Sequence, residues 1–430
     1  MLSAYQHIRR LAAPGLVLAA LLTAPDPGAG QERGRPDAAR TDSARTAHWR
    51  MDLAHLAAEL PRRHPDFFTH LEPARFRAEV AALRDTIPHL ADHEVALGLA
   101  RLAALAGDAH TAVVLPAGMP VAPMVFEWFD DGIRAYAVGP LWAPFVGARL
   151  VRVGGVPVTD AMARIRTVVS HENEPWFRHR AMSMLRTAPV LHALGLAPSP
   201  DSVRYTLEDA HGEGLEVALA ALPPERDVTW LVGGPPEGPR RPHYRRHGEL
   251  PYWFTVLPDE RTLYFQYNVC REDPARPMAA FAEALFAAAD SAGVERLVID
   301  LRLNPGGDSR VLEPVLARLS AHPLGERGSL AVLVGRRTMS SAVLNALALR
   351  RLAFPTFYGE PTGGAPNHFG EVKSFRLPRS GLEVRHSTRY FRQAPGITTP
   401  YLAPDVAVPI TWADFEAGRD PVLERALGGR

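Results

Sequence analysis

Residues 297–308 read LVIDLRLNPGGD, and this stretch decides the fold. Residues 297–301 form an apolar run interrupted only by Asp300, which is typical of a strand buried on both faces of a parallel sheet. The turn that follows ends in Gly306 and Gly307. Two adjacent glycines at a strand-to-helix corner let backbone N–H groups approach a phosphate, a carboxylate or the oxyanion of an acyl transfer. Taken alone, the segment favours a plain tight turn over a ligand site.

Strand and helix patterns alternate on both sides of this stretch. The apolar runs that predict strands cover residues 263–267, 297–301 and 330–334, and the helical spacings cover residues 278–289, 311–319 and 341–352. This alternation favours an α/β domain with parallel strands. Functional sites in such domains lie at the carboxyl ends of the strands, where loops lead into helices.

The loop after the third of these strands contains two serines. Residues 336–342 read RRTMSSA and open the next predicted helix. A serine held there has its hydroxyl near the positive end of the helix, with the next N–H group pointing the same way, as a nucleophile requires. Serine is also a frequent helix cap, and taken alone the loop favours that role for Ser340 and Ser341.

The N-terminus predicts an exported protein. Arg9 and Arg10 precede an apolar run over residues 11–24 and a small-residue exit, which together are typical of a signal peptide over residues 1–30. The run is too short to cross a bilayer. We therefore expect a periplasmic or extracellular protein with no stable membrane insertion.

Composition changes divide the rest of the chain. After a polar leader that ends near residue 45, apolar positions at helical spacing predict a helical N-terminal domain over residues 44–110, with its first helix stopping at Pro61. Short strands and a hairpin predict an α+β module over residues 111–221. A Pro/Gly/Arg-rich linker over residues 222–251 then leads into the α/β domain at residues 252–427.

Composition also excludes several classes of protein. Of the 430 residues, 47% are hydrophobic and 22% are charged, which rules out wholesale disorder. The net charge of +1 provides no global field for nucleic acid, so we expect no nucleic-acid partner. Cys270 is the only cysteine and cannot form an internal disulfide.

Several segments together resemble the tail-specific (C-terminal processing) serine peptidase family. They are residues 107–111 (GDAHT), 147–155 (GARLVRVGG), 300–307 (DLRLNPGG), 338–342 (TMSSA), 359–364 (GEPTGG), 375–382 (FRLPRSGL), 404–405 (PD) and 418–424 (GRDPVLE). Each motif is modest, but their order and spacing are those of the family. The segment 147–155 looks like the core of a degenerate PDZ-type module.

The resemblance implies a multidomain α/β protein with a Clp protease/crotonase-like catalytic core of ββα units. It further implies a serine nucleophile, which maps to Ser340 rather than Ser341. The oxyanion donors would be the amides of Gly306, Gly307 and Ser341. A PDZ-like module would suggest recognition of a peptide C-terminus.

The chain departs from the lysine-dyad pattern of this family. Ala365 stands where the catalytic lysine would be, and the only lysine of the chain is Lys373. The resemblance therefore points to the tricorn-core-like branch, in which the histidine of the GDAHT element, His110, is the general base. The third catalytic residue stays open, with Asp108 and Glu360 as candidate acids.

The resulting hypothesis is an exported serine endopeptidase that cleaves polypeptides through an acyl-enzyme on Ser340. The alternative is a non-catalytic ligand- or peptide-binding protein on the same scaffold. His89 and His93 lie four residues apart on a predicted helix, but their order is not that of a His-Glu-x-x-His site, so we predict no metal site and no cofactor. The sequence indicates no particular oligomeric state.

Overall fold

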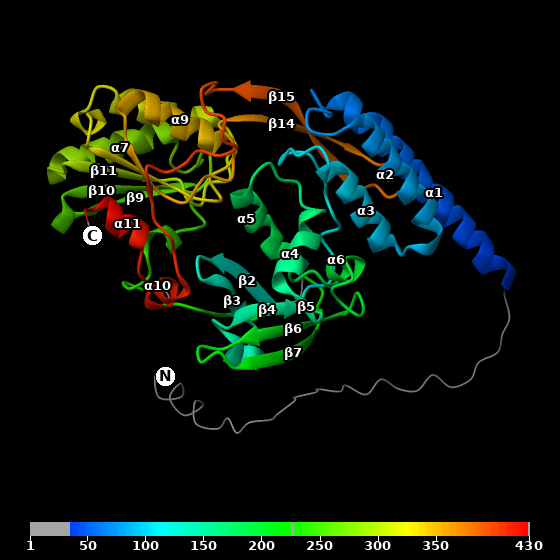
Figure 1. Ribbon diagram of the computed structural model, residues 1–430. Helices are drawn as coiled ribbons and strands as arrows, with labels where there is room; N and C mark the ends of the chain where they lie inside the picture. Colours follow the sequence, from blue (N-terminus) through cyan, green and yellow to red (C-terminus); the bar gives the residue numbers. More distant parts are fainter. Residues whose placement is uncertain (1–34, 225–227, 237, 429–430) are drawn as a thin grey trace.

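The computed structural model describes residues 35–224, 228–236 and 238–428, so the predicted signal peptide at residues 1–30 lies outside the described residues. Figure 1 shows a helical part in blue, an α+β module in green, and an α/β core that continues through yellow to red. A long hairpin of β14 (Asn367–Arg376) and β15 (Glu383–Arg392) reaches from the core to the helical part.

A six-stranded sheet forms the core. Its strands are β9 (Tyr252–Leu257), β10 (Thr262–Tyr267), β11 (Arg296–Asp300), β12 (Leu330–Val334), β13 (Thr356–Gly359) and β16 (Val406–Ala407). They lie in the order β16-β13-β12-β11-β10-β9. The pairs from β10 to β16 are parallel, whereas β9 pairs antiparallel with β10. The parallel sheet predicted from the alternating pattern is confirmed.

Helices cover both faces of this sheet. One face packs against α7 (Met278–Ala292), α8 (Glu313–Leu319) and α9 (Ser341–Ala353), and the other packs against α11 (Pro421–Ala426), which follows the short α10 (Trp412–Ala417). Successive strand residues point to opposite faces. Leu297 and Ile299 therefore pack with α7–α9, while Val298 packs with α11. This two-sided burial is why residues 297–299 and Leu301 are apolar, with the buried Asp300 as the exception.

The module has its own sheet and three helices. Its strands are β2 (Met124–Phe129), β3 (Gly132–Val138), β4 (Arg149–Val153), β5 (Val156–Pro157), β6 (Ser202–Glu208), β7 (Gly214–Ala220) and β8 (Leu231–Val232). The helices are α4 (Val158–Arg166), α5 (Glu174–Met184) and α6 (Ala188–Ala193). No pattern in the sequence predicts α5 or α6. Strand β8 pairs with β3, so part of the expected linker joins this sheet.

The helical part contains α1 (Arg35–Arg63), α2 (Pro73–Thr86) and α3 (Asp92–Ala104). The expected stop at Pro61 is wrong, because α1 continues to Arg63 and already begins at Arg35, within the expected polar leader. Proline removes one N–H group, but its fixed φ is helical, so the chain can complete its last turn beyond it. The N–H of His64 still donates to the Leu60 carbonyl at 3.1 Å.

The hairpin completes the core of the helical part. Strand β15 pairs with β1 (Ala112–Val113), and Leu377 and Val384 pack among the helices α1–α3. At the hairpin tip, the buried Asp52 carboxylate of α1 accepts the N–H groups of Arg379 and Ser380 at 2.8 and 2.7 Å. The helical part is thus anchored to a hairpin of the α/β core.

A buried ion-pair network fixes the turn after β11. The Arg302 guanidinium donates to Asp300 Oδ2 at 2.6 Å and to both oxygens of Asp420 at 2.7 and 2.8 Å. It also stacks over the Tyr244 ring at 4.5 Å. Arg302 is 6% exposed and Asp300 is fully buried. The DLR and GRDP motifs, far apart in sequence, are therefore two halves of one network.

Within the described ranges, no helix combines the length and the apolar character that crossing a bilayer requires.

We predict that Arg302→Met destabilises the protein by about 3–5 kcal/mol, because it leaves two buried carboxylates without their cation. Urea unfolding followed by circular dichroism measures this loss. Arg318→Met is the matched control, since Arg318 contacts Glu283 only at the surface and its loss should change the midpoint little. Equal small effects of both substitutions would contradict a structural role for the network.

Candidate active site

Ser340 holds the N-cap position of α9 in a strained conformation. Its φ of 54° and ψ of −125° lie outside the regions that residues with a Cβ favour, at a cost of about 1–3 kcal/mol. Its side chain makes no capping hydrogen bond, so Ser340 is not a conventional helix cap. A strained strand-to-helix turn that presents a serine hydroxyl is the geometry of a nucleophile elbow.

The neighbouring Ser341 is engaged differently. Its Oγ donates to the Gly307 carbonyl at 2.6 Å, which commits this hydroxyl to holding two loops together. Within the described residues, the N–H groups of Ser341 and Gly307 have no hydrogen-bond partner. Both were predicted as oxyanion donors, and both are available for that role.

Gly306 contributes space rather than a donor. Its N–H donates to Asn304 Oδ1 at 2.9 Å and is therefore occupied. Its φ is 101°, and a Cβ there would lie 2.8 Å from the Ser340 Cβ. Glycine is required at this position because the turn after β11 lies directly against the Ser340 loop.

Hydrogen bonds join the loops around Ser340. Thr338 Oγ1 donates to the Leu301 carbonyl at 2.8 Å, and the Met339 N–H donates to the Asn304 carbonyl at 3.0 Å. The Gly364 N–H donates to the Thr338 carbonyl at 3.0 Å. The three core motifs of the sequence thus meet around one backbone segment, which holds the strained serine in place.

Asp108 is a fully buried acceptor for several segments. Its carboxylate accepts hydrogen bonds from Thr111 Oγ1 at 2.5 Å, Ser387 Oγ at 2.6 Å and the His110 N–H at 2.9 Å, and it lies 3.1 Å from His64 Nε2. Burial alone would raise the pKa of this carboxyl, but its contacts with His110, His64 and Ser387 hold the pKa well below its usual range. Asp108 is therefore a fixed negative charge beside His110.

The ring of His110 is buried and its two nitrogens are unpaired among the described residues. Its Nδ1 lies 3.7 Å from Asp108 Oδ1, and neither ring nitrogen has a hydrogen-bond partner among the described residues. Burial lowers the pKa of His110, but the Asp108 carboxylate, together with Glu172 and the Phe369 backbone, raises it, so the net pKa is above its ordinary value. A buried imidazole oriented by a carboxylate suits a general base.

A short segment after β13 connects the surroundings of Ser340 and His110. A Cβ on Gly364 would lie 3.0 Å from the Ser340 nitrogen. The Ala365 carbonyl lies 2.7 Å from His368 Nδ1, and the His368 ring stacks on that of His110 with centroids 5.7 Å apart. No hydrogen bond between the described atoms joins Ser340 to His110. Catalytic hydrogen bonds often tighten only with substrate bound.

Glu172 is a site residue that sequence reasoning missed. Its Oε1 accepts the N–H of Ala365, the residue at the family's lysine position, at 3.2 Å. Burial raises the pKa of Glu172 to about 8. The nearby Asp108 carboxylate also raises this pKa, whereas His110 lowers it. Glu172 precedes α5, which the sequence pattern did not reveal, so no motif signalled this residue.

The other sequence candidates lie elsewhere. Glu360 pairs with Arg336, whose Nε donates to Glu360 Oε2 at 2.9 Å. Arg336 also donates to the Trp128 carbonyl at 2.5 Å, which ties strand β2 to the Ser340 loop. Of the two candidate acids, the structure therefore brings Asp108 to His110. Lys373 is exposed on β14.

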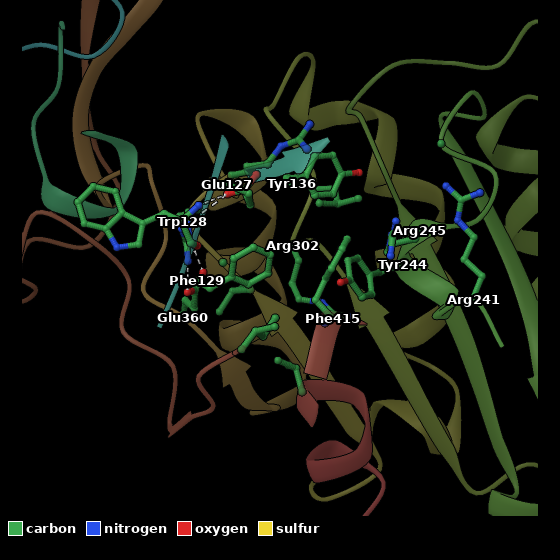
Figure 2. A pocket seen from close by; sticks show the side chains of 18 residues that line it. Glu127, Trp128, Phe129, Tyr136, Arg241, Tyr244, Arg245, Arg302, Glu360 and Phe415 are labelled. Atoms are coloured by element: carbon green, nitrogen blue, oxygen red, sulfur yellow. Dashed lines mark hydrogen bonds and ion pairs between the residues drawn. The ribbon is translucent and has the colours of Figure 1, made fainter. Parts of the chain in front are cut away.

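A cavity of 390 Å³ opens between the module and the carboxyl end of β12 (Figure 2). Aromatic rings of Trp128, Phe129, Tyr136, Tyr244 and Phe415 line it. Its charged lining consists of Arg241, Arg245, Arg302, Arg336, Arg337, Glu127 and Glu360. Arginines outnumber carboxylates here, and the cavity includes Gly335, Arg336 and Arg337 of the loop that leads to Ser340.

Comparison with solved structures establishes the fold. Mature CPAF in complex with lactacystin and mature CPAF alone each align with a TM-score of 0.64 at 14% identity, covering 89% of this chain and 97% and 96% of theirs. The chain has the fold of the tail-specific peptidase family. The predicted multidomain α/β fold with a Clp protease/crotonase-like core is confirmed.

At 14% identity, this likeness concerns the fold alone. No protein-family model matches the chain, and the search of curated proteins finds no match. The tricorn-like branch and the PDZ-like character of the module stay predictions.

We predict that Glu172→Gln becomes more stable relative to the natural protein as the pH rises from 5 to 8. In that window the unfolded chain loses the Glu172 proton while the folded chain, with its pKa near 8, retains it, so this carboxyl lowers stability as pH rises. Glutamine does not ionise and avoids this loss. Urea unfolding across this pH range measures the difference.

Glu216→Gln is the matched control, because Glu216 is exposed on β7. Its effect on unfolding should not depend on pH over the same range. A Glu172→Gln profile parallel to that of the natural protein would contradict the raised pKa.

Proposed function

We propose that this protein is an exported serine endopeptidase with Ser340 as nucleophile and His110 as general base. The observation that carries the proposal is the strained, uncapped Ser340 at the start of α9, flanked by the free N–H groups of Gly307 and Ser341. A helix cap alone would not require this backbone strain. The tail-specific peptidase fold supports the same assignment.

In the proposed reaction, His110 takes the Ser340 proton while Oγ attacks the carbonyl carbon of the peptide bond. The N–H groups of Gly307 and Ser341 then stabilise the negative charge on the carbonyl oxygen. His110 returns its proton to the leaving amine, which leaves an acyl group on Ser340. Water, deprotonated by His110, attacks this ester and releases the second product, and the proton returns to Ser340.

Asp108 is the proposed acid of this group. It accepts the His110 backbone N–H and lies 3.7 Å from the ring nitrogen, so it both orients the ring and stabilises the imidazolium formed during the reaction. The Glu172 carboxyl, whose pKa burial raises to about 8, also interacts with His110 and contributes to the raised pKa of that imidazole.

The cavity beside the Ser340 loop is the proposed binding site for the polypeptide substrate. Its aromatic lining suits apolar side chains, and its excess of arginines suits a carboxylate. Arg336 is neutralised by Glu360, whereas Arg337 is exposed and forms no ion pair with another described residue. We infer a preference for peptides that present an acidic group to Arg337.

We predict that Ser340→Ala abolishes labelling of the mature protein by a fluorophosphonate probe, because the alanine offers no oxygen to the phosphorus. Ser341→Ala should retain the label, since the Ser341 hydroxyl is already committed to the Gly307 carbonyl. His110→Ala should slow labelling by about 10²–10⁴-fold, which is the usual contribution of a general base. Gel fluorescence measures all three.

Labelling that persists in Ser340→Ala would overturn the nucleophile assignment. Absence of labelling and of peptide cleavage in the natural protein would favour the alternative, a ligand- or peptide-binding protein on this scaffold. Circular dichroism of each variant confirms that the loss of label is not a loss of fold.

We predict that Arg337→Glu lowers kcat/KM for acidic peptides by about tenfold or more, because one charge reversal at a partly exposed site changes the interaction by over 1 kcal/mol. Neutral peptides should be cleaved at nearly the natural rate. Arg337→Lys is the conservative control and should keep most of the preference. Equal effects on acidic and neutral peptides, measured with matched fluorogenic substrates, would contradict this role for Arg337.

A further inference from the structure

Two histidines and a glutamate meet where the helical part packs on the module. His93 and Glu94 lie in the first turn of α3, and His192 lies near the end of α6. The helices α3 and α6 are in contact. His93 Nε2 and His192 Nδ1 are 3.1 Å apart, and one ligand atom from each of the three residues lies within 4.8 Å of the others.

These distances suit a transition-metal ion. Zinc binds imidazole nitrogen at about 2.0–2.1 Å, so two imidazoles on one tetrahedral zinc have their nitrogens about 3.3 Å apart. The 3.1 Å separation in this pair is close to that value. Two imidazole nitrogens and a carboxylate oxygen form a donor set that zinc commonly takes, with water as the fourth ligand.

The surroundings of the three candidate ligands also suit a cation. The carboxylates of Glu94, Asp92 and Asp201 lie close enough to interact electrostatically with His93. All three candidate ligands are half-buried, so an ion can enter from solvent.

Glu94 is already oriented by the backbone. Its Oε2 accepts the N–H of Ala91 at 2.7 Å, in the capping arrangement of α3. A carboxylate fixed in this way loses little conformational freedom on binding a metal, as is common for ligands with an outer hydrogen bond.

We propose that His93, Glu94 and His192 form a zinc site that ties the helical part to the module. The sequence predicts no metal site because the apparent pair was His89 and His93, whereas the structure places His192, 99 residues away, beside His93. The ion would hold α3 against α6. Since α3 leads through Gly107 to Asp108 and His110, zinc would restrict the motion of the segment that carries the proposed base.

The test uses the full mature chain after chelator treatment and dialysis. Isothermal titration with ZnCl₂ should show one site per chain, and the thermal midpoint should rise with zinc, because an ion that binds only the folded state stabilises it. His93→Asn and His192→Asn should each weaken zinc binding at least about tenfold. His89→Asn is the matched control and should bind like the natural protein.

Cobalt substitution gives an independent readout on the natural protein. A visible absorption band of tetrahedral Co²⁺, displaced by zinc, is expected, and its loss in the two variants, with circular dichroism unchanged, would assign the ligands independently of stability. Absence of zinc binding to the natural chain would overturn the proposal, as would unchanged binding in both variants. Ser340→Ala should bind zinc normally, so the outcome is separate from the peptidase hypothesis.

Discussion

The buried carboxylate of Asp108 is the constraint on which the arrangement of this site depends. Its four partners come from the end of α1, from the segment around β1 and from β15. A carboxylate that is fully buried must have its acceptor sites filled, so these segments cannot separate without exposing an uncompensated charge. One ionised group therefore fixes the positions of the helical part, the hairpin and His110 relative to one another.

A second constraint acts on the nucleophile side. The strained backbone of Ser340 is tolerated because Thr338, Asn304 and Gly364 bond the surrounding loops, and Gly306 leaves room for them. Arg302, clamped by Asp300 and Asp420, fixes the turn that carries Gly306. The strain is thus offset by hydrogen bonds and a buried ion-pair network contributed by distant parts of the chain, which keeps the serine presented before substrate arrives.

The core sheet and the Ser340 loop were predictable because their signals are local. A run such as residues 297–299 is apolar at each position because both faces of the strand are buried, and two glycines before a helix specify the turn. The helices α5 and α6 were not predictable, because α5 buries only Phe177, Ala181 and Met182 and shows no apolar stripe. Glu172, which precedes α5, was missed for the same reason.

The sequence by itself determined the order of the motifs, the parallel sheet and the choice of Ser340 and His110 as candidates. Only the tertiary structure decided that Asp108, and not Glu360, accompanies His110, since Glu360 is paired with Arg336. It also decided that the Gly306 N–H is occupied, and that His93 faces His192 rather than His89. The physical reason is that pairing of buried charges and donors depends on distances between segments, which composition and local spacing do not encode.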